Sequence, residues 1–191
     1  MKFTIPNFLS LLRMGLVPLF IIAVLDGQSR KALLIFLIAG VTDALDGFIA
    51  RFANQQSLLG AYLDPIADKL LLTSAYVVLA IPQLNQGAPI PVWVTVLVIA
   101  RDLLIVVMAL ILYLAAGVRR FPPSVLSKLT TVLQVTAVLL VLVSALWPQL
   151  EPVASTLIYS VALFTVVSGL DYILRASRLQ GHGEKPEGLD R

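Results

Sequence analysis

The sequence is dominated by long apolar segments, which are separated by short connections rich in polar residues, proline or glycine. A helix needs about 20 predominantly apolar residues to cross a bilayer. Segments of about this length are Phe8–Leu25, Lys31–Phe52, Leu58–Ile81, Val92–Ala116, Ser124–Leu146 and Pro152–Leu174. Mean hydropathy is +0.93 and only 13% of the 191 residues are charged, which is not the composition of a soluble domain. We therefore expect an all-α, polytopic membrane protein with six transmembrane helices.

The first apolar segment is expected to remain in the protein as a membrane helix. Its stretch from Leu16 to Leu25 could be misread as a secretion signal, but Arg13 interrupts the approach and no small-residue cleavage pattern follows. We expect one membrane-embedded domain over residues 1–180 and a polar tail at 181–191, with the last apolar segment ending near Leu174. The absence of cysteine excludes disulfides and thiolate metal sites.

Basic residues are distributed unevenly between the two sides that six spans define. Both termini fall on one side, and the basic residues of that side include Lys2, Arg13, Arg51, Lys69, Arg119, Arg120, Lys128, Arg175, Arg178 and Lys185. The other side holds Arg30 and Lys31 and little else. The positive-inside rule therefore places both termini in the cytoplasm, and we expect a bacterial-type inner membrane location.

The stretch from Asp43 to Asp68 is unusual because it places four carboxylates in or beside apolar segments. An ionised side chain near the centre of a membrane helix costs roughly 2.5 to 3.5 kcal/mol, so such residues normally face a cavity, a partner or an ion. Residues three and four apart share a helix face, which pairs Asp43 with Asp46 and Asp64 with Asp68. A short turn between the two segments would make them antiparallel neighbours, so the two acid pairs can meet.

Facing carboxylate pairs form an all-oxygen ligand set, which suits Mg²⁺ or Mn²⁺ rather than zinc or copper. Four acids can bridge two such ions, the usual arrangement around the attacking and leaving oxygens of a phosphoryl displacement. Gly47, Ala50 and Gly60 leave room for a nucleotide diphosphate near the backbone, and Arg51 adds a guanidinium that fits phosphate. The alternative is a set of acids neutralised by basic residues. It is disfavoured because these two segments offer only Arg51 and Lys69 to four acids.

At these positions the sequence resembles the CDP-alcohol phosphatidyltransferases, whose signature is D-x-x-D-G-x-x-A-R-x(8)-G-x-x-x-D-x-x-x-D. Every fixed position of the signature is filled, in order, by Asp43, Asp46, Gly47, Ala50, Arg51, Gly60, Asp64 and Asp68. The resemblance extends over nearly the whole chain. It implies that the four aspartates hold two divalent ions over the pyrophosphate of CDP-diacylglycerol, and that Asp68 is the base that activates the acceptor hydroxyl.

The same resemblance implies further roles for residues around the acids. Gly47, Ala50, Arg51 and Gly60 would shape the nucleotide pocket, and Asn7 and Arg13 would reach the nucleotide from the first segment. The resemblance also implies a homodimer. Because CDP-linked substrates are made in the cytoplasm, the expected active site faces the compartment that supplies its substrate.

A second basic set is predicted to bind the acceptor, because phosphate is its natural partner. Its members are Arg101, Arg119, Arg120 and Lys128. Both glycerol-3-phosphate and phosphatidylglycerol carry a phosphate, so charge alone does not choose between them. At two positions the sequence differs from bacterial phosphatidylglycerophosphate synthases, which usually have Arg-Glu where this chain has Arg101-Asp102 and Gly-Lys where it has Ser127-Lys128. The Arg-Asp and Ser-Lys pairs of this chain look more like those of eukaryotic-type cardiolipin synthases. The alternative for Arg101 and Asp102, a structural ion pair, stays open.

An ion transporter is the alternative from another functional class. A cation or proton transporter would distribute its acids along a path through the bilayer, often on broken helices in two related halves. The acids here are concentrated at one side together with glycine and arginine, which favours phosphate chemistry. The expected partners are then CDP-diacylglycerol, the acceptor and membrane lipids, and no nucleic acid is expected.

Overall fold

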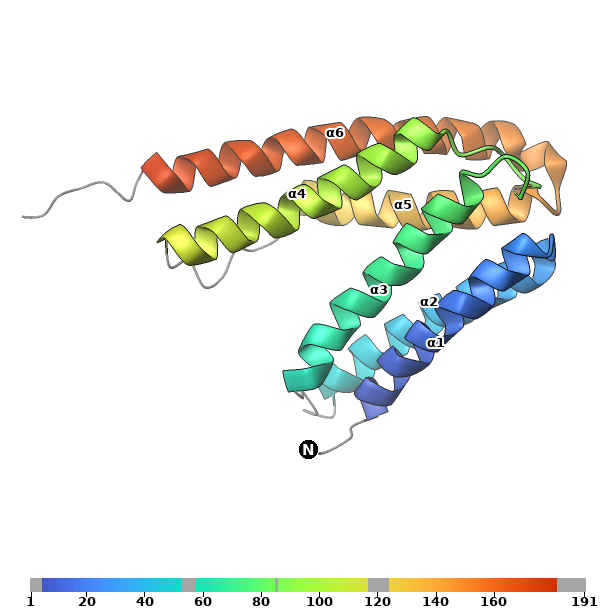
Figure 1. Ribbon diagram of the computed structural model, residues 1–191, viewed down its shortest axis with the longest axis horizontal. Helices are drawn as coiled ribbons and strands as arrows, with labels where there is room; N and C mark the ends of the chain where they lie inside the picture. The colour runs from blue at the N-terminus through green and yellow to red at the C-terminus, as the bar shows by residue number, and fades with distance from the viewer. Residues whose placement is uncertain (1–4, 53–57, 85, 117–123, 182–191) are drawn as a thin grey trace, which may run out of the picture.

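The computed structural model describes residues 5–52, 58–84, 86–116 and 124–181 (Figure 1). Within these ranges the chain is helical and contains no strand, which confirms the all-α prediction for this part of the protein. The elements are α1 (Ile5–Leu25), α2 (Ser29–Phe52), α3 (Leu58–Leu79), α4 (Val92–Ala116), α5 (Val125–Ser144), the 3₁₀ helix η1 (Pro148–Leu150) and α6 (Glu151–Gly181). The six long helices correspond one to one to the six apolar segments.

The last helix is longer than the apolar pattern predicts, because α6 continues to Gly181 instead of ending near Leu174. The residues that follow Leu174 are polar, but none before Gly181 is a proline or glycine that would break the helix. Arg175 Nε also donates to the Asp171 carboxylate one turn earlier, at 3.0 Å. Apolar periodicity marks the part of a helix that must be shielded from water, and it does not mark a polar extension.

The contacts between the long helices define two groups of three, which can be followed in Figure 1. In one group α1 packs against α2 and α3, and in the other α6 packs against α4 and α5. The groups meet where α5 lies against α2 and α3 and where α3 contacts α4. In Figure 1 they lie together near the α1–α2 turn and diverge toward the N-terminal end of α1 and the C-terminal end of α6. The described ends of α1 and α6 therefore lie at the divergent end of the molecule.

The end where the groups meet is closed by two glycines. Gly27 turns the chain between α1 and α2 with a φ of 67°, in the left-handed region that favours glycine. Gly87 lies so close to α5 that a Cβ atom there would be 2.2 Å from the carbonyl oxygen of Val141. The next residue, Ala88, donates its backbone N–H to Ser144 Oγ at 2.9 Å. These contacts join the α3–α4 connection to the end of α5 and fix the two groups at this end.

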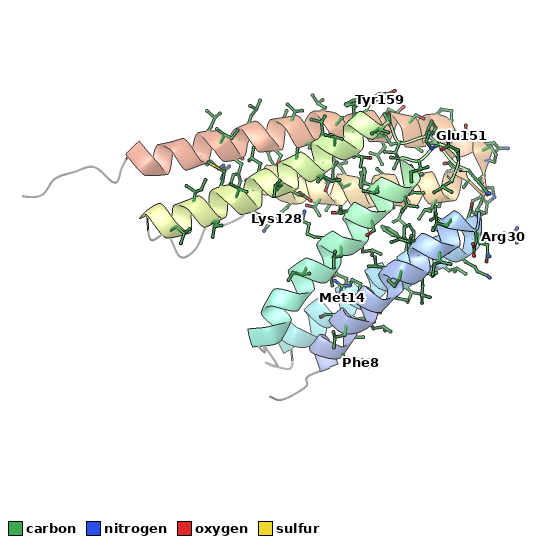
Figure 2. The ribbon with its side chains drawn as sticks, in the orientation of Figure 1. Phe8, Met14, Arg30, Lys128, Glu151 and Tyr159 are labelled. Carbon is green, nitrogen blue, oxygen red and sulfur yellow. The ribbon has the colours of Figure 1, made fainter. Side chains whose placement is uncertain are left out.

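Small side chains line the helix interfaces, and large apolar side chains face outward. Buried alanines at the interfaces include Ala23, Ala32, Ala39, Ala75, Ala137 and Ala154. They let helix backbones approach closely, as is common in membrane bundles. Phe8 and Tyr159 point away from the bundle (Figure 2) and are each more than half exposed. An apolar exterior of this kind is the surface of an integral membrane protein.

Among the described residues, three helical stretches are long and apolar enough to cross a membrane. They are Phe8–Leu25, Val125–Ser144 and Pro148–Arg175, from α1, α5 and η1 with α6. The remaining long helices, α2, α3 and α4, contain residues of the acid motif or the Arg101–Asp102 pair, and some of their side chains lie outside the described part of the structure. The structure therefore supports a membrane bundle without fixing all six spans.

Candidate active site

A cavity of about 130 Å³ lies between α1, α2, α3 and α5. Its polar wall is formed by Arg13 from α1, Asp43 from α2 and Asp68 from α3. These residues lie far apart in the sequence, and the packing of α1 against both α2 and α3 brings them together. A water molecule takes about 30 Å³ of liquid volume, so the cavity has room for a few waters or for ions with their ligands. It can enclose the reacting groups of a substrate but not a whole lipid.

Arg13 and Asp43 form an ion pair at the edge of this cavity. Arg13 Nη1 lies 2.5 Å from Asp43 Oδ1, and the Arg13 side chain is fully buried while 47% of the Asp43 side chain is exposed. A buried guanidinium needs a paired anion, because an uncompensated buried charge is strongly destabilising. The pair therefore fixes one oxygen of Asp43. Arg13 was predicted to reach the nucleotide, and in the structure it pairs with Asp43, one of the predicted metal ligands.

The other motif residues lie on the same two helices, on either side of the α2–α3 connection. Asp46, Gly47, Ala50 and Arg51 follow Asp43 in α2, and Gly60 and Asp64 precede Asp68 in α3. The helical backbone puts Asp46 about one turn after Asp43 and Asp64 about one turn before Asp68. The side chains of these residues, and that of Asn7, lie outside the described part of the structure. Arg119 and Arg120 lie outside the described residues altogether.

The carboxylates that are described fit a divalent cation. Asp43 and Asp68 reach one cavity from two helices, and their donor atoms are all oxygens, the ligands that Mg²⁺ and Mn²⁺ prefer. Asp46 and Asp64 are the nearest further acids along the same helices. The described side chains alone contain no group of three or more acidic, histidine or cysteine residues that could hold a metal. Two of the four predicted ligands are thus brought together by the observed packing.

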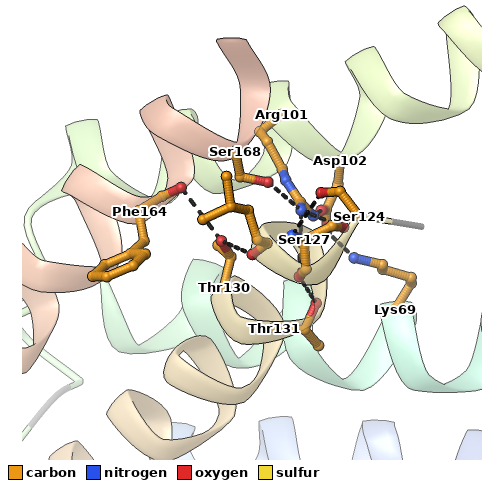
Figure 3. Close-up of polar contacts among 10 residues, drawn as sticks. Lys69, Arg101, Asp102, Ser124, Ser127, Thr130, Thr131, Phe164 and Ser168 are labelled. Carbon is orange, nitrogen blue, oxygen red and sulfur yellow. Dashed lines mark hydrogen bonds and ion pairs between the residues drawn. The ribbon is translucent and has the colours of Figure 1, made fainter. Parts of the chain in front are cut away.

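A second polar cluster joins four helices around Arg101 of α4 (Figure 3). Arg101 is only 5% exposed, and its Nη2 donates to Ser127 Oγ of α5 at 2.6 Å and to Ser168 Oγ of α6 at 2.8 Å. Its Nη1 donates to Asp102 Oδ1 at 2.9 Å. The second oxygen of Asp102 accepts from Lys69 Nζ of α3 at 2.5 Å. We call these five residues the Arg101 network.

The predicted acceptor residues Arg101 and Lys128 occupy different environments. The Arg101 guanidinium is buried and donates to the side chains of three residues, which matches the alternative of a structural pair with Asp102. Lys128 is exposed in the first turn of α5, which Ser124 caps by accepting from the backbone N–H of Ser127 at 3.0 Å. An exposed ammonium at a helix start is the more accessible of the two for a phosphate.

Sequence reasoning did not assign Lys69 and Ser168 to a site. The sequence marks Lys69 as a basic residue of the cytoplasmic side and as one of two possible counter-charges for the acids, and Ser168 is one of several serines within apolar segments. A serine on a membrane helix commonly hydrogen-bonds across to another helix. That signal could have suggested a polar contact for Ser168, but not its partner.

Together, the fold and the site define a membrane-embedded helical bundle in which carboxylates from two helices meet at a cavity between the helices. The sequence model of the CDP-alcohol phosphatidyltransferase family matches residues 3–167 of this chain, which includes the whole acid motif. The chain therefore belongs to the CDP-alcohol phosphatidyltransferase family.

Similar proteins within the family carry two different names. The cardiolipin synthase (CMP-forming) of Rattus norvegicus is 46% identical over 104 residues, which cover 54% of this chain and 33% of the rat protein. A probable phosphatidylglycerophosphate synthase of Mycobacterium tuberculosis is 36% identical over 180 residues, 90% of this chain and 81% of that protein. The CDP-diacylglycerol–glycerol-3-phosphate 3-phosphatidyltransferase of Haemophilus influenzae is 36% identical over 181 residues, 91% of this chain and 93% of that protein. This chain thus spans about a third of the rat protein and most of the two bacterial ones.

Proposed function

We propose that this chain is an enzyme of phospholipid biosynthesis that transfers the phosphatidyl group of CDP-diacylglycerol to a glycerol hydroxyl and releases CMP. The observation that carries the proposal is the meeting of Asp43 and Asp68 at one cavity, in a chain of the CDP-alcohol phosphatidyltransferase family. A lipid substrate suits a site inside a membrane bundle. The acids are concentrated in α2 and α3 instead of following a path through the bilayer, which favours an enzyme over a cation or proton transporter.

The proposed chemistry assigns distinct roles to the motif. Asp43, Asp46, Asp64 and Asp68 would hold two Mg²⁺ or Mn²⁺ ions, which supply charge neutralisation for the diphosphate and for the leaving CMP. Asp68 accepts the proton of the acceptor hydroxyl while the hydroxyl oxygen bonds to the phosphorus that carries diacylglycerol. The bond from that phosphorus to the CMP oxygen breaks in the same displacement. The residues proposed to form the nucleotide pocket are Gly47, Ala50, Arg51, Gly60 and Asn7, with Arg13 holding Asp43.

Phosphatidylglycerol is the proposed acceptor, which would make the chain a cardiolipin synthase. Support comes from the 46% identity to the rat cardiolipin synthase over 104 residues and from the Arg101-Asp102 and Ser127-Lys128 pairs. Glycerol-3-phosphate is the second candidate, because the mycobacterial and Haemophilus proteins match about nine tenths of this chain. Either acceptor presents a phosphate. Of the two predicted acceptor residues whose side chains are described, Lys128 is the exposed one and is proposed to bind this phosphate, with help from Arg119 and Arg120.

We also propose that all six helices span a bacterial-type inner membrane, with both termini and the acid-lined cavity facing the cytoplasm, in a homodimer. The chain contains no cysteine, so single cysteines can be introduced and labelled without a background. Gln28→Cys and Gln149→Cys should react with an impermeant reagent added outside, and Gly183→Cys only after the membrane is opened.

The mass of the protein in detergent, measured by light scattering, would reveal a monomer if the dimer proposal is wrong.

The reaction is tested by supplying the purified protein with Mg²⁺, labelled CDP-diacylglycerol and one acceptor at a time. The acceptors are phosphatidylglycerol, glycerol-3-phosphate, serine and inositol phosphate, and the readouts are the lipid product and the CMP released. Cardiolipin formed only with phosphatidylglycerol supports the proposal in full. Phosphatidylglycerophosphate formed with glycerol-3-phosphate selects the second acceptor. If CMP is not released with any of the four acceptors, the enzyme assignment is contradicted.

A further inference from the structure

Lys69 immediately follows Asp68 in α3, yet its ammonium is held by another helix. Lys69 Nζ lies 2.5 Å from Asp102 Oδ2 of α4, across the contact between the two helix groups (Figure 3). Residues next to each other on a helix do not face one another, so the two neighbours point to different surroundings. Asp68 lines the acid cavity, and Lys69 belongs to the Arg101 network. A cation and a proposed metal ligand are thus kept apart although they are adjacent in the chain.

Within the Arg101 network, Asp102 is the member that decides where the Lys69 ammonium lies. The Asp102 side chain is only 14% exposed, and its other oxygen is held by Arg101, which is itself fixed by Ser127 and Ser168. The Lys69 side chain is 42% exposed. A lysine stem has four rotatable bonds and carries a compact charge. The carboxylate is therefore the fixed partner in this ion pair, and the ammonium is the group that would move if the pair were broken.

A released Lys69 ammonium would have an alternative partner within reach. Asp68 precedes it directly in α3, and although the two side chains do not share a helix face, the four rotatable bonds of the lysine stem let the ammonium turn toward the neighbouring carboxylate. An ammonium paired with a carboxylate competes with a divalent cation for the same oxygens, and this competition is strong where water is scarce. Asp43 already has a cationic partner in Arg13. A second internal cation at the acids would lower the net negative charge that a pair of divalent ions requires.

We propose that Asp102 is a positioning residue that holds the Lys69 ammonium on α4 and so keeps this cation off the proposed metal ligands. The inference rests on the proposed function, because it assigns Asp102 a role in divalent cation affinity. Asp102 itself does not bind the cation. Its effect passes entirely through Lys69, so removal of the lysine charge should make the aspartate charge dispensable for metal binding.

The experiment is a double-mutant cycle on the full chain in detergent, with Asp102→Asn, Lys69→Gln and the combined variant. Mn²⁺ binding is measured directly from the electron paramagnetic resonance signal of the free ion, and CMP release is followed against Mg²⁺ concentration. Asp102→Asn should raise the dissociation constant for Mn²⁺ by about ten-fold. Lys69→Gln and the combined variant should both bind within about two-fold of the wild type. The matched controls are Asp26→Asn and Lys31→Gln at the opposite end of the bundle, which remove the same charges and should change nothing.

Three results would overturn the inference. In the first, Asp102→Asn binds Mn²⁺ as tightly as the wild type, so Asp102 has no effect on divalent cation affinity. In the second, the combined variant remains as weak as Asp102→Asn, so the effect of Asp102 does not pass through Lys69. If Asp102→Asn does not fold, Asp102→Ser replaces it; failure of both to fold, with no rescue by Lys69→Gln, also makes the pair purely structural. A wild type that neither binds Mn²⁺ nor releases CMP would contradict the proposed function itself, which is a separate outcome.

Discussion

The acid cavity and the Arg101 network both place charge among apolar helices, but they leave very different groups available. In the network, the two oxygens of Asp102 accept from Arg101 and Lys69, and the Arg101 guanidinium also donates to two serine hydroxyls. At the cavity, the buried Arg13 pairs with Asp43, whose side chain is 47% exposed, and Asp68 contributes a second carboxylate to the same space. In the network, both oxygens of the carboxylate are matched by cations, and at the cavity carboxylates line an open space.

This difference suggests how to separate structural charge from functional charge in a membrane bundle. Breaking a matched buried cluster leaves an uncompensated group behind, so substitutions there should act first on stability. Asp68 lines the cavity, and Asp43 is the cavity carboxylate that pairs with the buried Arg13. Neutralisation of Asp68 therefore costs less in the folded state, and a substitution there should act first on ligand binding and turnover. Both clusters carry an Arg and an Asp, so residue type alone does not separate them.

The largest effect is expected for Asp68→Asn at the cavity. The amide keeps the size of the side chain but cannot accept the acceptor proton, so CMP release should fall by about 10³-fold. The midpoint of thermal unfolding in detergent should shift little, because the amide fills the same space and creates neither a cavity nor an unpaired charge, the usual causes of large losses of stability. Asp26→Asn in the exposed α1–α2 turn is the control for both measurements. Retained turnover in Asp68→Asn would remove the residue from the chemistry.

The converse pattern is expected for Arg101→Met in the network. Methionine keeps most of the volume but leaves Asp102 with Lys69 as its cationic partner and removes the donor to Ser127 and Ser168. The free energy of unfolding should fall by about 3 kcal/mol. It is measured by denaturation in mixed detergent micelles, with wild-type protein in the same micelles as the reference. A fully stable variant that has lost only acceptor binding would place Arg101 in the substrate site and break the comparison.

A smaller effect is expected for Lys128→Gln, which removes an exposed cation at the start of α5. If Lys128 holds the acceptor phosphate, the KM for the acceptor should rise by about ten-fold, the effect of one charged contact, while that for CDP-diacylglycerol changes by less than about two-fold. Stability should be unchanged because the side chain is exposed. Lys31→Gln is the matched control. Equal changes in both KM values would exclude Lys128 from the acceptor site.

The apolar pattern and the spacing of the acids predicted most of the fold. Each apolar segment became a helix because the bilayer-length runs contain few breakers, and Asp43 and Asp68 met because short connections make neighbouring helices antiparallel. The same reasoning could not predict that Arg13 would pair with Asp43. It also could not choose between the two interpretations of Arg101, because the choice depends on hydroxyls of Ser127 and Ser168 that packing brings in from other helices. Local spacing encodes helix faces, whereas the pairing of charges across helices depends on packing angles.

The smallest effect is expected for Ser168→Ala, and it tests whether the network is as well matched as the contacts indicate. The substitution removes one acceptor from Arg101 Nη2, which still has Ser127 Oγ at 2.6 Å. The free energy of unfolding should therefore fall by only about 0.6 kcal/mol, the average for a hydrogen bond between membrane helices. The control is Ser160→Ala, because the Ser160 hydroxyl donates to Thr156 O within its own helix at 2.9 Å and joins no second helix. If Ser168→Ala lowered the free energy of unfolding as much as Arg101→Met, Ser127 alone would be unable to hold the guanidinium. The network would then be a weak contact, and ligand binding could change its geometry.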